Sequence, residues 1–147
     1  MIINSDCFEY IKEIKNNSVD LILTDPPYFI SRNSNFRKTS NKTPDDMKKK
    51  YDISIDFGEW DKNFDLYEWI DSYSKILKKN GSIIIFCSYR YMSFIINKLE
   101  LSGLIVKDIL IWKKTNPMPR NTNRRYVQDM EFAIWAINKN AKWVFNK

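Results

Sequence analysis

Short apolar runs rich in β-branched residues alternate with amphipathic segments of helical length, and this alternation limits the folds open to the chain. Such runs predict strands, and the first long one is expected to be a central strand buried on both faces, as in parallel sheets. The predicted strands are residues 1–4 (MIIN), 19–24 (VDLILT), 82–88 (SIIIFCS), 104–114 (LIVKDILIWKK), 130–138 (MEFAIWAIN) and, as a further possibility, 142–146 (KWVFN).

Three segments between these runs have helical periodicity. Residues 5–15 start with Ser5 or Asp6 as a candidate N-cap, and residues 64–81 and 89–103 each finish at a glycine. The order strand, helix, strand, helix, strand predicts an α/β fold with a mostly parallel sheet, right-handed crossovers and an antiparallel strand pair near the C-terminus. Residues 31–51 are polar and basic and predict a long mobile loop within a single domain of 147 residues.

Composition excludes several classes of function. The chain has no histidine and only two cysteines, so no metal site is expected. Its three glycines are too far apart for a phosphate-binding or dinucleotide-binding loop. No apolar run is long enough for a membrane span and no signal peptide is evident, which predicts a cytoplasmic protein. The net charge of +6 is compatible with a polyanionic partner such as DNA.

Residues 25–28 (DPPY) follow the predicted strand 19–24 directly. Ligands of open α/β sheets bind beyond the carboxyl ends of strands. Pro26 and Pro27 fix the backbone and donate no N–H, Asp25 adds a carboxylate acceptor, and Tyr28 adds a flat ring. Acceptors beside a ring suit a planar ligand that carries an NH₂ group, such as a nucleobase. The alternative is an ordinary turn at the end of a strand.

The sequence resembles the site-specific DNA adenine-N6 methyltransferases, in particular the circularly permuted class in which the catalytic half precedes the cofactor-binding half. The resemblance rests on residues 4–31, 77–92 and 111–139, and above all on DPPY followed by NPMP at residues 116–119. It implies a Rossmann-like methyltransferase fold. It also implies methyl transfer from S-adenosylmethionine to the exocyclic amine of an adenine flipped out of DNA.

The resemblance also assigns roles to residues. It assigns Asp25, Pro26, Pro27 and Tyr28 to catalysis, with Asp25 and the Pro26 carbonyl accepting hydrogen bonds from the amine and Tyr28 stacking on the base. It assigns Asp6, Cys7 and Asp25 to the cofactor, with Asp6 contacting its adenosine. An N-cap role explains Asp6 equally well. The DNA-contacting candidates in and around the NPMP loop are Lys113, Asn116, Pro117, Met118, Pro119, Arg120, Arg124 and Arg125, with Lys114 beside them. Each of these cations has a solvated loop as its alternative.

The chain lacks the segments that follow in the family, including the target-recognition region and the glycine-containing loop for the methyl donor. It therefore corresponds to the catalytic half, with an exposed hydrophobic edge expected at the opening strand. Alone it is expected to bind S-adenosylmethionine poorly and to turn over little. A complementing polypeptide would complete it. The alternatives are a cytosine-N4 methyltransferase and a non-catalytic DNA-binding remnant, while a protein or RNA amine methyltransferase is more distant.

The remaining aromatic and thiol side chains are assigned to the core. Trp60, Trp69, Trp112 and Trp135 recur at helical or strand spacing and are expected to be buried. Cys87 lies within an apolar strand and is expected to be a small buried residue and not a nucleophile.

Overall fold

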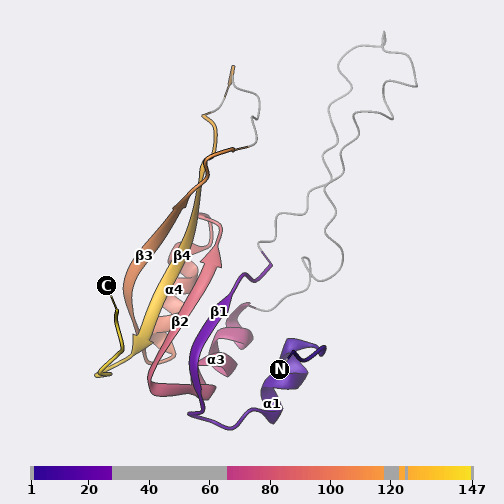
Figure 1. The fold of residues 1–147 in the computed structure, drawn as a ribbon, viewed down its shortest axis with the longest axis vertical. Coiled ribbons are helices and arrows are strands. Elements are labelled where there is room, and N and C mark those ends of the chain that lie inside the picture. The colour runs from indigo at the N-terminus through magenta and orange to yellow at the C-terminus, as the bar shows by residue number, and fades with distance from the viewer. Residues whose placement is uncertain (1, 28–65, 118–122, 125, 147) are drawn as a thin grey trace, which may run out of the picture. The chain divides into compact units, whose positions relative to one another are not determined.

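The computed structural model describes residues 2–27, 66–117, 123–124 and 126–146 (Figure 1). The chain divides into two units, and the account below concerns the first, which comprises residues 1–26 and 65–147. The second unit and the predicted loop at 31–51 lie, apart from Pro27, outside the described residues. The elements are α1 (Cys7–Glu13), β1 (Val19–Thr24), α3 (Leu66–Ile76), β2 (Leu77–Cys87), α4 (Met92–Leu101), β3 (Leu104–Lys113) and β4 (Met130–Asn138).

The described strands form one sheet in the order β1-β2-β4-β3. β1 and β2 are parallel, whereas β4 is antiparallel to both of its neighbours. The α/β fold and the C-terminal antiparallel pair are therefore confirmed. The expectation of a mostly parallel sheet is wrong for the described residues, because β4 runs between β2 and β3 and turns two of the three pairings antiparallel.

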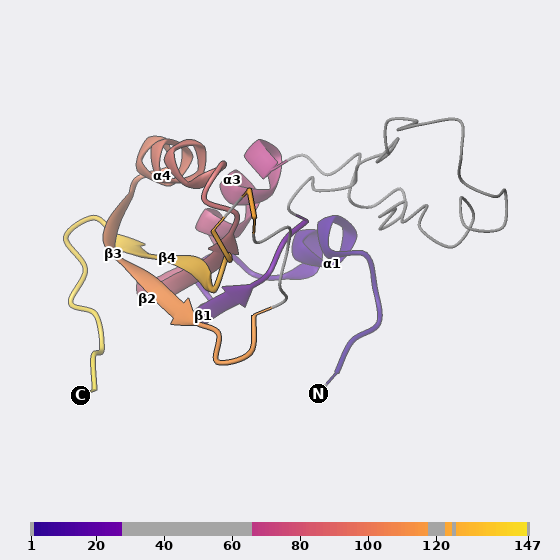
Figure 2. The same ribbon diagram turned by 90° about the horizontal axis from the view of Figure 1, so that it is seen from above.

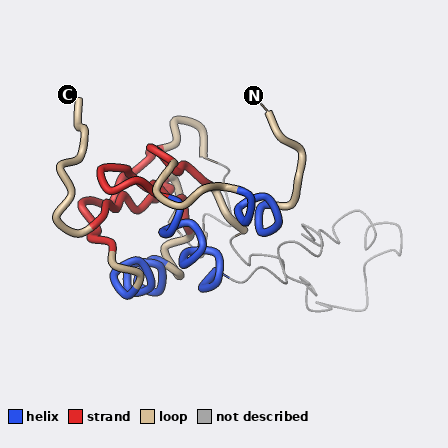
Figure 3. The backbone as a smooth tube through the Cα atoms, turned by 90° about the horizontal axis from the view of Figure 1, so that it is seen from below, coloured by secondary structure: helices blue, strands red, loops and turns tan. Residues whose placement is uncertain are grey.

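Helices α3 and α4 cover one face of the sheet (Figures 2 and 3). Alternate residues of β2 explain this, because Ile83, Ile85 and Cys87 are almost fully buried while Ile84 and Phe86 between them are only half-buried. The opposite face, called the open face below, carries the side chains of Leu21, Leu23, Ile84, Phe86, Leu110 and Trp135. No helix of the described residues is long and apolar enough to cross a membrane.

β1 is an edge strand, which corrects its assignment as a central strand buried on both faces. It pairs with β2 on one side and, within the described residues, with nothing on the other. Ile22 is 5% exposed, but Leu21 and Leu23 on the open face are 53% and 62% exposed. The alternation of burial is typical of a strand covered on one face only.

The predicted terminal strands are also wrong. Residues 2–4 and 142–146 are not strands, and Ile2 is 99% exposed. A strand is stable only when its backbone N–H and C=O groups pair with a neighbour, and the described residues offer neither segment a partner. The exposed hydrophobic edge was predicted at the opening strand, so this prediction is wrong in its place; the edge strands of the described sheet are β1 and β3.

The second helix ends earlier than the sequence suggests. α3 ends at Ile76, and Leu77 already pairs with Val19 as the first residue of β2. Gly81 lies inside β2 and does not cap a helix. A Cβ there would lie 2.8 Å from Leu77 Cδ1 and 3.0 Å from the Asp20 carbonyl oxygen, so this glycine allows close packing of β1 against β2.

The end of α4 follows the prediction. The helix ends at Leu101, and Gly103 has a φ of +83°, the left-handed conformation that glycine adopts at no steric cost. The Gly103 N–H donates to the Glu100 carbonyl at 3.1 Å. Gly103 then starts the chain on its return through β3.

Asp71 joins α3 to α4. Its Oδ2 accepts from Lys98 Nζ, and its Oδ1 accepts from Ser102 Oγ at 2.6 Å. The hydrogen bonds from Lys98 and Ser102 lower the pKa of the Asp71 carboxyl below its ordinary value of 3.8. A depressed folded-state pKa stabilises the fold above the unfolded-state pKa, and this stabilisation is lost as pH falls through the folded-state value.

We expect Asp71→Asn to lower the free energy of unfolding at pH 7, and the difference from the native chain to shrink below about pH 4. Urea unfolding at pH 7 and at pH 3 measures both differences. Glu100→Gln, an exposed carboxylate on α4, is the matched control and should leave the pH dependence unchanged. A deficit of Asp71→Asn that is equal at the two pH values would contradict the linkage.

Candidate active site

β1, β2 and β3 run in the same direction and β4 runs in the opposite one. The carboxyl ends of β1, β2 and β3 and the start of β4 therefore lie at the same end of the sheet. The described residues that follow these strands are Asp25 to Pro27, Ser88 to Tyr91 and Lys114 to Pro117. Parallel strands place the residues beyond their carboxyl ends together, which makes this edge the candidate site.

Asp25 and Pro26 follow β1 directly and differ in their exposure to solvent. Asp25 is exposed, whereas Pro26 is buried. The buried proline holds the turn against the sheet and its ring fixes φ, so the carboxylate beside it is presented to solvent from a rigid backbone. Thr24 pairs with Ile85, which sets Asp25 level with the last residues of β2. Tyr28 lies outside the described residues.

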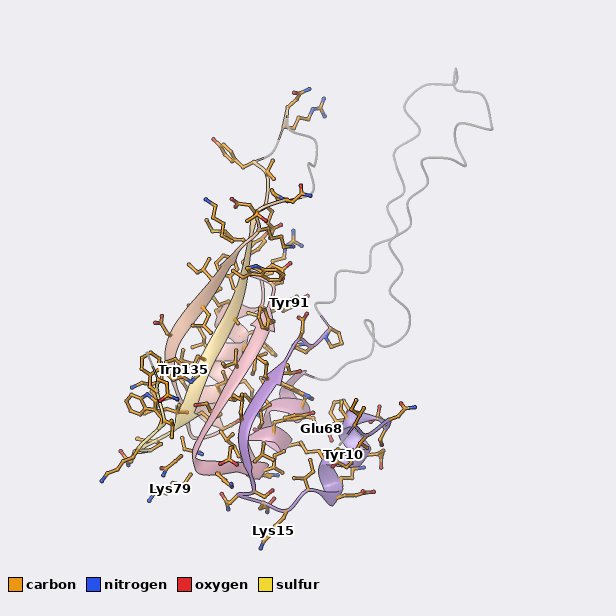
Figure 4. All side chains as sticks on the ribbon, in the orientation of Figure 1. Tyr10, Lys15, Glu68, Lys79, Tyr91 and Trp135 are labelled. Carbon is orange, nitrogen blue, oxygen red and sulfur yellow. The ribbon has the colours of Figure 1, made fainter. Side chains whose placement is uncertain are left out.

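The turn after β2 was missed by the sequence prediction. Tyr89 is 51% exposed, Arg90 Nε donates to the Tyr89 hydroxyl at 3.4 Å, and the Arg90 guanidinium lies 5.8 Å from the Tyr89 ring centroid. Tyr91 follows at the end of β2 (Figure 4), where its N–H donates to the Ser88 carbonyl at 2.9 Å. These residues could have been found in the sequence only from their position, because they directly follow the strand that pairs in parallel with β1.

Asp6 caps α1. Its Oδ1 accepts from the N–H groups of Phe8 at 2.8 Å and Glu9 at 3.2 Å. The structure therefore confirms that Asp6 is the N-cap of α1, whereas a role of Asp6 at a cofactor stays a prediction. Cys7 beside it is half-buried, and burial together with the Asp6 charge raises the pKa of its thiol. A thiol with a raised pKa is a poor nucleophile at neutral pH.

The hairpin of β3 and β4 continues past the end of β2, whose last residue Cys87 pairs with Phe132. The extension, called the arm below, comprises residues 112–117, 123–124 and 126–131, and it projects beyond the sheet in Figure 1. The Lys114 side chain pairs with Glu131, and the Lys114 N–H donates to the Asp129 carbonyl at 2.6 Å. These contacts connect the two sides of the arm near its base.

The arm carries some of the predicted DNA contacts. Lys113, Asn116 and Arg124 are exposed, and Pro117 is half-buried. The remaining candidates lie outside the described residues: Met118, Pro119, Arg120 and Arg125. Lys113 and Arg124 are therefore the described cations of this set whose side chains are open to solvent, whereas Lys114 is engaged by Glu131.

Trp112 corrects the assignment of the aromatic residues to the core. Trp69 is 1% exposed as expected and Trp135 is half-buried, but Trp112 on the arm is 57% exposed. Trp60 lies outside the described residues. Trp112 pairs with Glu131 beyond the end of β2 and lies on the same face as Leu110, the open face, so strand spacing did not predict its exposure.

The turn at Asp25 and Pro26 and the arm lie at the same end of the sheet but are not adjacent. β2 lies between β1 and β4, the nearer strand of the arm, so the two segments leave the sheet roughly 10 Å apart at a strand spacing of about 4.8 Å. The prediction that the NPMP loop borders the site is compatible with this arrangement and is not tested by it.

The described residues fit an amine better than they fit a methyl donor. Asp25 supplies an exposed acceptor at the site, but the two described glycines lie away from it, Gly81 inside β2 beside Asp20 and Gly103 directly before β3. A cofactor loop needs glycine backbone close to the ligand. Cys87 offers no alternative chemistry, because burial raises the pKa of its thiol to about 11.

A family model described as DNA methylase matches residues 19–147, which include every described strand of the sheet. The chain belongs to this family. The DNA methylase chain is 33% identical over 149 aligned residues to the type II methyltransferase M.HinfI of Haemophilus influenzae. It is 30% identical over the same length to the type II methyltransferase M2.DpnII of Streptococcus pneumoniae.

Solved structures extend the likeness to the fold. The chain is 44% identical to M1.HpyAVI with a TM-score of 0.71, and the match covers 99% of this chain and 58% of that one. The PvuII cytosine-N4-specific methyltransferase is 16% identical with a TM-score of 0.59, which shows a shared fold alone. The match to M.HinfI covers 99% of this chain but 40% of that protein, and the match to M2.DpnII covers 97% and 52%. The chain thus spans about half the length of the relatives it matches.

Proposed function

We propose that this chain is the catalytic half of a DNA adenine-N6 methyltransferase of a restriction-modification system. The observation that carries the proposal is the placement of Asp25 and Pro26 directly after β1, at the same sheet edge as the arm with Asn116 and its cations. The relatives named as type II methyltransferases support the same activity. The substrate, the donor and the partner are part of the proposal.

In the proposed reaction Asp25 and the Pro26 carbonyl accept hydrogen bonds from the exocyclic amine of a flipped adenine. The amine lone pair is delocalised into the ring, and acceptors that hold the two hydrogens out of the ring plane return it to nitrogen. The nitrogen would bond to the methyl carbon as the bond from that carbon to the donor's sulfur breaks, with the electron pair leaving on sulfur, and one amine proton would then pass through Asp25 to solvent. Tyr28 would stack on the base.

S-adenosylmethionine would supply an electrophilic methyl group. A crystal structure of the M1.HpyAVI–SAM complex, 43% identical to this chain, supports that donor. Asp6 would contact the adenosine through the carboxylate oxygen that the cap leaves over. The poor fit of the described glycines to a donor loop supports a complementing polypeptide, which would hold the rest of the cofactor. The proposed assembly is therefore this chain, its complement, the donor and DNA.

Coexpression tests the proposal. We expect this chain, produced together with the portion of M1.HpyAVI outside the match, to methylate DNA, and mass spectrometry of the digested DNA to detect N6-methyladenine. N4-methylcytosine in its place would favour the runner-up assignment. An assembled complex that binds DNA without methylating it would favour the non-catalytic DNA-binding alternative.

We expect Lys113→Ala and Arg124→Ala each to weaken DNA binding by the complex and to reduce the salt dependence of log K by about 0.9. Both cations are exposed on the arm, where they can contact phosphates. Fluorescence anisotropy with a labelled duplex over a series of salt concentrations measures the slope. Lys139→Ala is the matched control, because this exposed lysine follows β4 at the opposite sheet edge. An equal loss in the Lys139 variant would remove the arm from the DNA interface.

A further inference from the structure

Tyr89 and Arg90, in the turn after β2, form an exposed pair that the proposed reaction does not use. Arg90 Nε donates to the Tyr89 hydroxyl at 3.4 Å, and the Arg90 guanidinium lies 5.8 Å from the Tyr89 ring centroid. The hydroxyl and the ring orient the guanidinium, and the contact at Nε leaves both terminal nitrogens for a ligand. Planar N–H groups of this kind bind phosphate oxygens in pairs.

The turn itself is held at both ends. The Tyr91 N–H donates to the Ser88 carbonyl at 2.9 Å, and the Arg90 N–H donates to Ser88 Oγ at 3.4 Å. Ser88 directly follows the last residue of β2, and Tyr91 is the N-cap of α4, where its carbonyl accepts from the Ile95 N–H at 2.9 Å. A strand and a helix therefore fix the backbone of Arg90, as a binding site on rigid elements requires.

Arg90 lies beside Asp25 because β1 and β2 are adjacent parallel strands. Thr24 pairs with Ile85, so Asp25 is level with Phe86, one strand spacing of about 4.8 Å away. The turn with Arg90 begins shortly beyond this level, whereas the arm leaves the sheet from β4 and β3. Among the described cations at this end of the sheet, Arg90 is therefore the one that follows the strand next to β1.

No carboxylate of the described residues forms an ion pair with Arg90. The ion pairs of this part of the chain join lysines to carboxylates: Lys12 to Glu9, Lys78 to Asp20, Lys98 to Asp71 and Lys114 to Glu131. The side-chain contacts of Arg90 are with Tyr89 instead. An exposed cation that is oriented by an aromatic ring and keeps its charge unpaired suits an external anion.

We propose that Arg90, oriented by Tyr89, binds the backbone phosphate of the nucleotide whose base Asp25 holds. This inference rests on the proposed function for the place of the base and adds a site for the phosphate. The sugar separates the base of a nucleotide from its phosphate, so the acceptor for the amine and the cation for the phosphate must lie near each other with a gap between them. Asp25 and Arg90 fit this requirement, because they follow adjacent strands at one end of the sheet. One contact on the base and one on the backbone fix a flipped nucleotide in a single orientation.

Mononucleotides test the phosphate site with the chain alone, without a complement, a methyl donor or DNA. The probes are the 5′-monophosphate and the 3′-monophosphate of 2′-deoxyadenosine, with 2′-deoxyadenosine itself as the reference, and NMR titrations of the amide resonances measure binding. We expect the native chain to bind one of the two monophosphates at least about fivefold more tightly than the nucleoside, because the phosphate adds charge-assisted hydrogen bonds. The same monophosphate should shift the amide resonances of Ser88 to Tyr91.

Variants separate the phosphate site from the base site. Arg90→Ala, checked for folding by circular dichroism, should bind the monophosphate only as tightly as the nucleoside. Arg90→Lys should keep part of the preference, because lysine retains the charge but not the planar N–H groups. Lys139→Ala removes the same charge at the opposite end of the sheet and is the matched control, which should keep the full preference. Asp25→Ala should weaken binding of nucleotide and nucleoside by the same factor, because it acts on the base.

A preference for the monophosphate that survives in folded Arg90→Ala would overturn the proposal. Equal binding of the monophosphates and the nucleoside by the native chain, or unshifted resonances of Ser88 to Tyr91, would also overturn it. Inorganic phosphate that binds the native chain as tightly as the monophosphate would do the same, since the anion site would then be independent of the base. An unchanged affinity in Asp25→Ala, with the Arg90 effect intact, would contradict the proposed function and leave the phosphate site in place.

Discussion

Asp25→Ala in the assembled enzyme is expected to lower kcat for methyl transfer by at least about 10² to 10³-fold, the usual loss when one preorganised polar group at the reacting atom is removed. Asp25 is exposed at the end of β1 beside the buried Pro26, so the substitution removes the acceptor without leaving a cavity. Single-turnover assays with tritiated S-adenosylmethionine measure the chemical step separately from product release.

Two further variants make the Asp25 result interpretable. Asp20→Ala removes a carboxylate from the same strand, where it pairs with Lys78 at 2.7 Å near the opposite edge of the sheet, and it should leave kcat unchanged. Asp25→Asn keeps one acceptor oxygen but turns the other into a donor that faces the amine hydrogens, so we expect a substantial loss here too. An Asp25→Ala enzyme within about threefold of the native rate would remove Asp25 from the chemistry.

The apolar composition of residues 19–24 predicted a strand with a buried face, but not that β1 would be an edge strand of the described sheet. The residues of β1 have the composition of a buried parallel strand, and Ile22 is buried as that composition predicts. Leu21 and Leu23 are exposed because the described helices cover only the other face of the sheet (Figure 2). The composition of a strand does not show whether one of its faces or both are covered.

The helix boundary at Ile76 shows a second limit of local patterns. Leu77 continues the apolar spacing of α3 and Gly81 stands where a capping glycine would be expected, so the helix was extended too far. The decisive contacts are distant in sequence, since Leu77 pairs with Val19 and the Lys78 carbonyl accepts from Asn138 Nδ2 at 2.8 Å. Tertiary pairing thus overrides helical periodicity at this boundary.

Position in the fold explains which candidate residues the sequence suggests. Asp25 is a candidate because it follows a predicted strand directly, and the structure shows its side chain exposed just beyond the end of β1, while its role stays a prediction. Tyr89 and Arg90 occupy the equivalent position after β2 and were missed, because serine, tyrosine and arginine in a turn form no distinctive pattern. Trp112 was assigned to the core from its spacing, although the length of the arm beyond β2 leaves it exposed.

Trp69→Ala is expected to lower the free energy of unfolding of the chain by about 3 to 5 kcal/mol, a large part of the 5 to 15 kcal/mol typical of a domain. Trp69 is 1% exposed and its ring centroid lies 4.4 Å from that of Tyr73 on the next turn of α3. Tyr73 is half-buried, and burial, with a smaller contribution from Cys7, raises the pKa of its phenol. α3 packs against α1.

Trp69→Ala should therefore destabilise α1 and its Asp6 cap as well as the core. Urea unfolding followed by circular dichroism measures the loss of stability, and hydrogen exchange should show α1 losing protection before the sheet does. Trp143→Ala is the control, because Trp143 is 38% exposed and contacts Lys107 on the far side of the sheet, so its removal should cost about 1 kcal/mol or less. Equal losses of stability in the two variants would contradict the expected contribution of Trp69, and unchanged protection of α1 in Trp69→Ala would mean that Trp69 does not anchor this helix.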